Sequence, residues 1–477
     1  MKPLLKENNS VGEVVNFVSR DQLTDSNIQH WHDENPINFS AEERSKTTLL
    51  FGGLTEMHDQ LLEAGMVALG YKAKALPVAD FEALQCGKEY GNRGQCNPTY
   101  FTVGNLVNYL CDLRDNKNLS VAEIIKSYLF VTAATCGPCR FGMYVTEYRK
   151  ALRDAGFEGF RILSFQGGHA GKGGNKNGGL ETDIKFFSTA IKCVVIADVL
   201  NAIGYRIRPY EVENGATDRA LAASKELLQV AIGKRKSLIK ALYQCRKLLA
   251  AVKTDFSLVK PKVLVIGEFW AMTTEGDGNY RLQRFLEQEG AECEVQPITN
   301  WLLYMLWEEK SRLKETMLLR RVKSTENSHK DKKSVPASFQ VNMATLGLKG
   351  FFYGVASLLG LKKYKLSDMD EIARISHPYY LNEVRGGEGH MEVGKLIQAV
   401  EQKKAHLVIS VKPFGCMPSS GVSDGVQSLI TARYPKANFI AIETTGDGAV
   451  NVYSRVQMAL FRARKQAQKE SDLLLSE

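Results

Sequence analysis

Residues 262–269 read KVLVIGEF, a short apolar run that begins directly after Lys260-Pro261. Its near-continuous Val, Leu and Ile side chains are typical of a strand that is buried on both faces of a parallel sheet. A helical pattern follows over 280–289, and a second strand-like run occupies 293–298. A strand, a helix and a strand in this order predict a βαβ unit.

The same alternation continues on both sides of this unit. Further strand-like runs occupy 47–53, 73–78, 127–133, 160–165, 406–411 and 439–443. Helical patterns lie between them, including an apolar one over 184–203 and one over 218–252 that we expect to form a single helix. Because strands that alternate with helices form parallel sheets, we predict an α/β protein with two Rossmann-like or flavodoxin-like domains.

The length of 477 residues exceeds what one hydrophobic core usually serves. We expect an irregular N-terminal arm over 1–44, a first α/β domain over 45–255 and a second over 256–477. A basic linker or insertion is expected near 310–340, because nine Lys or Arg and three Asp or Glu lie between Lys310 and Lys333. This segment accounts for most of the net charge of +9 and lacks aromatic residues that stack on bases. A solvated helix and linker is therefore favoured over nucleic-acid binding, with a patch for an anionic cofactor or partner as the alternative.

Two features of the sequence concern location. No run approaches about 18 uninterrupted apolar residues, and residues 1–12 lack the apolar centre of a secretory signal. We therefore expect a cytoplasmic protein that does not enter a membrane. Its nine cysteines are then in a reducing compartment, where structural disulfides are rare. Metal ligation, redox chemistry and simple burial are the roles left open for them.

Three cysteine segments are set in glycine and proline turns. They are GNRGQCNP with Cys96, TCGPCR with Cys136 and Cys139, and PFGCMP with Cys416. Such turns expose backbone N–H groups that offset the negative charge of thiolate and sulfide. Cys139 and Cys416 each follow a predicted strand, one in each domain, so we expect one site between the domains. An Fe–S cluster is the favoured group, with a zinc ion or a redox-active Cys136–Cys139 dithiol as alternatives.

Five segments stand out when they are taken together: NRGQCNP (92–98), TCGPCRFGMY (135–144), RIRPYE (206–211), VIGEFW (265–270) and PFGCMPSSGVSDGVQ (413–427). They resemble the 2-hydroxyacyl-CoA dehydratase family, in particular its branch related to acyl-CoA dehydratase activases, and the likeness extends from about residue 45 to residue 465. The resemblance implies a [4Fe–4S] cluster, or in some members a double-cubane cluster, held by cysteines between Rossmann-like domains. By their positions in the motifs, Cys96, Cys139 and Cys416 match the ligands best, and Cys136 and Cys86 are weaker candidates.

The resemblance also implies a reaction and a partner. In the family, an ATP-hydrolysing activator protein passes an electron to the cluster, which serves an oxygen-sensitive lyase in the radical dehydration of a 2-hydroxyacyl-CoA. The chain itself does not match a phosphate-binding loop, because Gln166 and Gly173 stand where Gly and Ser or Thr are required. The activator is therefore expected in trans, together with an acyl-CoA substrate and a homo- or heterodimer. An Fe–S electron-transfer partner without its own substrate and a zinc-stabilised interaction protein are the alternative functions.

Three side chains near these motifs are candidates for further roles. Glu388 and His390 lie in the run GGEGH (386–390) and could donate a proton to departing hydroxide, with a loop and helix cap before 391–400 as the alternative. Glu268 follows the strand-like run and is expected to face the cleft between the domains or to cap a helix. The remaining cysteines are expected to be buried apolar side chains: Cys111, Cys193, Cys245 and Cys293.

Overall fold

The computed structural model describes residues 38–134, 139–166, 179–323, 334–384 and 387–476. Residues from 36 onward form one compact unit that contains both sheets of the fold. Most of the expected arm over 1–44 lies outside the described residues. In its described part, Phe39 is fully buried and packs against the first sheet.

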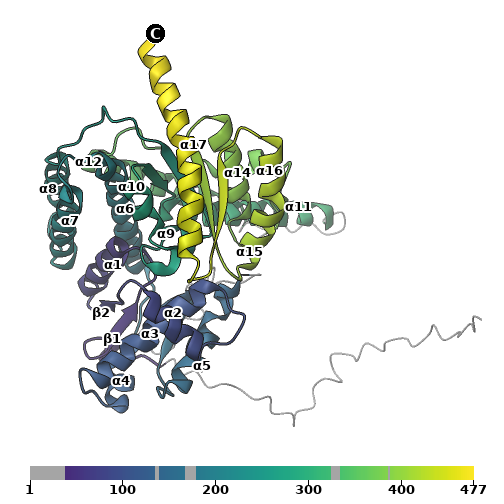
Figure 1. The fold of residues 1–477 in the computed structure, drawn as a ribbon. Helices are drawn as coiled ribbons and strands as arrows, with labels where there is room; N and C mark the ends of the chain where they lie inside the picture. Colours follow the sequence, from purple (N-terminus) through teal and green to yellow (C-terminus); the bar gives the residue numbers. More distant parts are fainter. Residues whose placement is uncertain (1–37, 135–138, 167–178, 324–333, 385–386, 477) are drawn as a thin grey trace, which may run out of the picture. The chain divides into compact units, whose positions relative to one another are not determined.

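Two four-stranded sheets, each with all its strands parallel, form the centre of the fold (Figure 1). The strand order is β2-β1-β3-β4 in the first sheet and β6-β5-β7-β8 in the second, which is the order of a doubly wound flavodoxin-like sheet. The predicted α/β class is therefore confirmed, and all eight strand-like runs form strands. The strands are β1 (Thr48–Phe51), β2 (Lys72–Ala75), β3 (Tyr128–Ala134), β4 (Ile162–Gln166), β5 (Lys262–Gly267), β6 (Glu292–Val295), β7 (Leu407–Pro413) and β8 (Phe439–Thr444).

Helices connect the strands and cover the sheets. In chain order they are α1 (Glu56–Ala68), α2 (Phe81–Tyr90), α3 (Asn97–Asp115), α4 (Val121–Ser127), α5 (Tyr144–Asp154), α6 (Ile184–Ile207), α7 (Ala216–Gly233), α8 (Leu238–Ala250), α9 (Phe269–Thr273), α10 (Leu282–Gln288), α11 (Ile298–Lys323), α12 (Ser334–Leu359), α13 (Met369–Ser376), α14 (Gly389–Glu401), α15 (Met417–Ser420), α16 (Gln427–Arg433) and α17 (Ala449–Ser476). Within the basic segment expected near 310–340, the described residues are helical, in α11 and α12, and 324–333 lie outside the described residues.

The central strand β5 of the second sheet is buried on both faces. Val263 and Val265 pack on one side with α17, whereas Leu264 and Ile266 pack on the other side with α14 and α16. Figure 1 shows α17 on one side of this sheet and α14 and α16 on the other. Side chains of a strand alternate between faces, so a strand with a core on each side needs an unbroken apolar run. This explains why KVLVIG lacks polar alternation.

The first sheet is also covered on both faces. Leu50 of β1 and Phe130 of β3 pack with α3 and α5, and Leu49 and Leu129 pack on the opposite face with Phe39. Leu49 is in register with Leu129, and Leu50 with Phe130, so each pair presents the same kind of side chain to the same face. The carboxyl ends of β1 and β3 therefore lie together at one edge of the sheet.

A third core consists of helices alone and joins the two halves of the fold. It contains α6, α7 and α8, together with α1 from the first half and α11 and α12 from the second. Leu200 of α6, Leu228 of α7, Cys245 of α8 and Phe352 of α12 are completely buried there. Both α/β halves therefore depend on shared apolar packing.

The single helix predicted over 218–252 is wrong. The segment forms two helices, α7 and α8, which pack against each other. Gly233 ends α7, Arg235 adopts a left-handed φ of 50°, and Ser237 is the N-cap of α8. The Arg235 guanidinium donates to the carbonyl oxygen of Ala68 at 2.6 Å, which fixes the turn against the end of α1. Gly233 and the polar residues 234–237 interrupt the apolar pattern, and the prediction of a single helix overlooked this local signal.

Helix α6 is, within the part of the chain that the structure describes, the one helix long and apolar enough to cross a membrane. Half of its apolar window is buried, and it forms the centre of the helical core. The core helix of a globular protein meets the same criteria of length and composition, and the packing of α6 is that of a core helix.

Candidate functional site

The loops of Cys96 and Cys416 lie against each other, although they belong to different halves of the fold. The N–H of Asn97 donates to the carbonyl oxygen of Phe414 at 3.0 Å. Gly415 has a left-handed φ of 76°, and a Cβ built there would lie 3.2 Å from the Cα of Cys96. Glycine is therefore required at this position for its backbone conformation and for the close approach of the two loops.

The Cys139 loop reaches the same place from the end of β3. The Arg140 guanidinium donates to the carbonyl oxygen of Gly94, in the Cys96 loop, at 2.5 Å. The thiols of Cys139 and Cys96 are also close enough to interact electrostatically. The structure thus brings together the three cysteines that the sequence motifs single out, whereas Cys136 and the glycine-rich residues 167–178 lie outside the described residues.

Each of the three cysteines occupies the N-cap position of a helix. Cys96 precedes α3, Cys139 precedes the 3-10 helix η3 (Arg140–Met143), and Cys416 precedes α15. The first N–H groups of a helix have no partners within the helix and carry partial positive charge. The backbone N–H groups of Phe141 and Ser419 lower the pKa of Cys139 and Cys416 respectively, although the opposite effect of burial is larger at both cysteines.

Helix α5 supplies two contacts that the sequence reasoning missed. The Tyr144 hydroxyl and the Cys96 sulfur are 3.1 Å apart. The buried Glu147 carboxylate accepts hydrogen bonds from the side chains of Asn92 at 2.8 Å and Gln95 at 2.9 Å, and so holds the loop before Cys96. The spacing of positions 144, 147, 148 and 151 puts them on one helical face. Glu147 is the one charged residue on this otherwise apolar face, and this feature of the sequence could have predicted a buried polar contact.

The Cys416 thiol is buried and the Cys139 thiol is half-buried. Burial raises the pKa of Cys139 to about 12 and also raises the pKa of Cys416, and the carboxyl groups of Glu268 and Glu388 contribute to both shifts. Both thiols are therefore protonated at neutral pH. Redox-active cysteines have lowered pKa values, so raised values argue against dithiol chemistry. They are compatible with binding of a cationic group, which would displace the thiol protons.

The carboxyl groups of the half-buried Glu268 and the buried Glu388 lie beside these thiols. Glu268 accepts the N–H of Ala271 at 2.8 Å and caps α9, which confirms the predicted capping role. Glu388 accepts the indole N–H of Trp301 at 3.1 Å. Burial, followed by the charge of Glu268, raises the pKa of Glu388 to about 8, and burial also raises the pKa of Glu268. Because both carboxyl groups are poorly hydrated and near each other, the pair holds a proton at neutral pH.

His390, the other candidate proton donor, has a different environment. Its ring packs against Tyr304 and Trp307, with ring centroids 4.8 and 4.6 Å away. Its Nε2 atom is buried and has no hydrogen-bond partner among the described residues, and burial lowers the pKa of the ring to about 4. The ring is therefore neutral at pH 7, which makes it a poorer proton source than the carboxyl pair.

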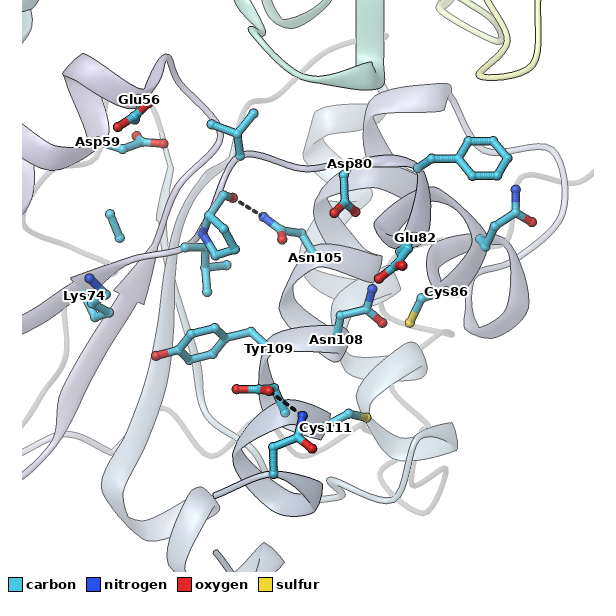
Figure 2. A pocket seen from close by; sticks show the side chains of 18 of the residues that line it. Glu56, Asp59, Lys74, Asp80, Glu82, Cys86, Asn105, Asn108, Tyr109 and Cys111 are labelled. Atoms are coloured by element: carbon cyan, nitrogen blue, oxygen red, sulfur yellow. Dashed lines mark hydrogen bonds between the residues drawn. The ribbon is translucent and has the colours of Figure 1, made fainter. Parts of the chain in front are cut away.

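The remaining cysteines occupy other parts of the molecule. Cys86 lies beside Cys111 at the wall of a separate cavity (Figure 2), and burial raises its pKa to about 12. Cys111 is only half-buried, whereas Cys193, Cys245 and Cys293 are buried, as predicted.

Within the described ranges, no three His, Cys, Asp or Glu side chains lie close enough to bind a single metal ion. A mononuclear zinc site would need its four ligands around one centre. A four-iron cluster binds its cysteines through different irons, so their sulfurs lie farther apart than around one zinc ion.

No protein-family model matches this chain. A search of curated proteins likewise finds no similar sequence.

Proposed function

We propose that this chain binds an Fe–S cluster through Cys96, Cys139 and Cys416 and is the cluster-bearing subunit of a lyase of the 2-hydroxyacyl-CoA dehydratase type. The convergence of three cysteine loops from both halves of the fold supports this function most strongly. Cys139 and Cys416 lie at the carboxyl ends of parallel strands, which is where open α/β sheets bind ligands. The sequence motifs around the same three cysteines support the same family.

The donor set is chemically suited to such a cluster. Burial raises the pKa of the Cys139 and Cys416 thiols, so both are protonated in the absence of a cation, and a bound iron would displace these protons. All three cysteines directly precede a helix. A bound cluster supplies one-electron chemistry and a Lewis-acidic iron. A single cubane is better supported than a double cubane, because Cys86 lies beside Cys111 on the wall of another cavity.

The chain's own residues then hold the ligands and supply protons. The Tyr144 hydroxyl, 3.1 Å from the Cys96 sulfur, can donate a hydrogen bond to a thiolate there. Glu388 is protonated at neutral pH and lies near Cys139 and Cys416, so it is the best-placed group to protonate a departing hydroxide. Glu268 contributes by keeping the pKa of Glu388 high.

The proposed reaction also defines the partners. The chain would receive its electron from an ATP-hydrolysing activator in trans and would act on an acyl-CoA, as a homo- or heterodimer in an oxygen-poor cytoplasm. An electron-transfer protein without its own substrate would use the same cysteine site. The two functions differ in whether an acyl-CoA perturbs the cluster.

The decisive experiment is anaerobic purification followed by assays of iron, sulfide and zinc per chain and by EPR spectroscopy after reduction. We expect about four irons with matching sulfide, and a change in the EPR spectrum when a 2-hydroxyacyl-CoA is added. A cluster that no acyl-CoA perturbs would favour the electron-transfer function. Zinc without sulfide, or no metal after anaerobic reconstitution, would exclude the proposal.

A further inference from the structure

Helix α12 is apolar on two opposite faces, although only one of them is buried. On the inner face, Leu348, Phe352 and Val355 pack in the helical core, where α12 lies against α6 and α8. The outer face is exposed, and none of the described residues covers it. A helix that is apolar all round is normally buried on every side. The outer face of α12 is therefore a surface that lacks a partner in the described part of the chain.

The exposed face forms a continuous stripe with the spacing of a coiled-coil seam. Its members, which are all exposed, are separated alternately by four and three residues: Phe339, Met343, Leu346, Gly350, Tyr353 and Ser357. This alternation keeps side chains on one face along the whole helix, and it is the pattern by which one helix packs along another. The α12 stripe, as we call these six residues, therefore fits a helix as its partner.

The α12 stripe carries no charge, and this limits the partner further. Lys349 is the one charged residue in the sequence of α12, and it lies outside the stripe. A helix with charged side chains at the facing positions would have to bury them without counter-charges, which costs free energy. The α12 stripe of a second copy is itself uncharged, so a second copy satisfies this requirement.

The order of large and small side chains in the stripe suits an antiparallel pairing of two copies. If two α12 helices cross at position 348, Phe339 lies opposite Ser357 of the second copy, because the two positions are equally far from 348 in the sequence. Leu346 lies opposite Gly350 of the second copy for the same reason. Each of these pairs combines a large side chain with a small one, as close packing between facing helices requires.

The remaining pair and the space at Gly350 agree with this arrangement. Met343 lies opposite Tyr353 of the second copy, and a flexible thioether packs well against an aromatic ring. A Cβ built on Gly350 has no atom within 4 Å, so this position has room for a leucine side chain from outside. A parallel pairing would instead place Gly350 opposite Gly350 and Phe339 opposite Phe339, which leaves a gap at one level and crowding at the other.

We propose that α12 is the dimerisation surface of this protein and that two copies join through antiparallel pairing of their α12 stripes. Such an interface is isologous, because the same residues of both copies serve both sides of it. The proposed function includes a homo- or heterodimer, and this inference commits to a homodimer and names its surface. It does not rest on the cluster, because the α12 stripe contains none of the three converging cysteines.

The first test is sedimentation velocity of the full-length protein over a range of concentrations. We expect a dimer with a Kd below about 10 µM. Met343→Glu places an unpaired charge in the seam and should raise the Kd at least about tenfold. Met458→Glu is the matched control, since Met458 is an exposed methionine of α17, outside the stripe, and should leave the dimer unchanged. Thermal unfolding by circular dichroism should show that both variants remain folded, because both positions are exposed.

A pair of substitutions tests the antiparallel register directly. Gly350→Leu brings two leucines face to face in the dimer, and it should raise the Kd at least about tenfold. The monomer should tolerate this change, because leucine favours a helix more than glycine does and the position is open. Leu346→Ala/Gly350→Leu exchanges the large and small positions and should restore most of the affinity. If the double variant is no better than Gly350→Leu, the antiparallel pairing is wrong.

Two further results would overturn the proposal. One is a wild-type protein that stays monomeric up to about 50 µM. The other is a dimer that Met458→Glu disrupts and Met343→Glu does not. Flotation with phosphatidylglycerol vesicles tests the competing occupant, since binding that Met343→Glu abolishes, without a dimer, would assign the stripe to a membrane surface. Iron is assayed in the same samples, so that a dimer without iron contradicts the proposed cluster alone and an iron-loaded monomer contradicts the α12 interface alone.

Discussion

At the scale of single residues, the three converging cysteines differ from the other described cysteines in their surroundings. Each of the three lies at the start of a helix. The loops of Cys96 and Cys416 contact each other, and the Cys139 thiol interacts electrostatically with Cys96. Cys193, Cys245 and Cys293 instead lie inside apolar packing. Cys96 and Cys416 are as buried as these core cysteines, so convergence of the loops, and not burial, distinguishes the proposed ligands.

Replacement of Cys139 tests the ligand assignment. We expect Cys139→Ser to lose most of its iron and sulfide when it is purified anaerobically, because a serine hydroxyl is a much weaker ligand for iron than a thiolate. Cys111→Ser is the matched control, since Cys111 is also half-buried but lies on α3 beside Cys86. A full complement of iron in Cys139→Ser would show that the assignment is wrong.

The carboxyl pair predicts a pH dependence of stability. The pKa of Glu388 is about 8 in the folded protein, against an ordinary value of 4.5. Between these pH values the unfolded chain releases the proton and the folded chain retains it, so the free energy of unfolding falls as pH rises. The contribution of the protonated Glu388 carboxyl to the free energy of unfolding is complete below pH 4.5 and is lost by about pH 8.

The side chain in Glu388→Gln has no proton to release. Between pH 5 and 8 the free energy of unfolding should therefore fall less in this variant than in the wild type, and the two falls should differ by a few kcal/mol. Urea unfolding of the metal-free protein at several pH values measures this difference. Glu158→Gln, at an exposed position, should keep the wild-type slope. Equal slopes in Glu388→Gln and the wild type would contradict the raised pKa.

At the scale of elements, the site depends on how closely the Cys416 loop approaches the Cys96 loop. Gly415 has a φ of 76°, and a Cβ there would lie 3.1 Å from the Gln95 carbonyl oxygen. Gly421, a few residues later, has a helical φ and nothing within 4 Å of its built Cβ. The two glycines therefore form a matched pair of strained and unstrained positions.

We expect Gly415→Ala to lower the free energy of unfolding by about 1–2 kcal/mol, through the left-handed conformation and the tight contact. It should also lower the iron content, because the Cys416 loop must move away from Cys96. Gly421→Ala should be neutral in both assays. Urea unfolding and iron analysis of the two variants test this element, and normal iron in Gly415→Ala would show that the close approach is unnecessary for binding.

At the scale of the whole molecule, the two α/β halves share a buried polar junction as well as the helical core. Asp198 of α6 accepts a hydrogen bond from His58 of α1 at 3.1 Å. The same carboxylate accepts the N–H groups of Ile298 and Thr299, at the start of α11, at 2.9 and 2.7 Å. One side chain thus ties the first half, the helical core and the second half together.

We expect residues 36–477 to unfold in a single transition despite containing two sheets, because neither half keeps its core without the other. Asp198→Asn should lower the free energy of unfolding by about 3–5 kcal/mol, since it places an amide N–H₂ group against backbone donors in a buried site. Circular dichroism and tryptophan fluorescence during urea unfolding should report the same midpoint. Two separate transitions in the wild type would show that the halves are independent.

The fold class and the approximate positions of the strands in the described residues could be predicted from the amino-acid sequence alone. Apolar runs such as 262–267 and the helical patterns between them are local signals, because burial on both faces of a strand leaves a mark on consecutive residues. The cysteine turns were also visible locally, through the glycine and proline residues that shape them. The break between α7 and α8 was also marked locally, by Gly233 and the polar residues that follow it, although the prediction missed it. The contact of Arg235 with the end of α1 is a tertiary feature of this turn.

Only the tertiary structure decided which of these local features act together. It brought Cys96, rather than Cys86, to Cys139 and Cys416, and it set Glu268 beside Glu388. It also gathered carboxylates from α1, α2 and α3 around one cavity. These outcomes depend on burial and on hydrogen bonds between segments far apart in the chain. The pKa values also depend on desolvation by such distant segments, which a residue's neighbours in sequence do not reveal.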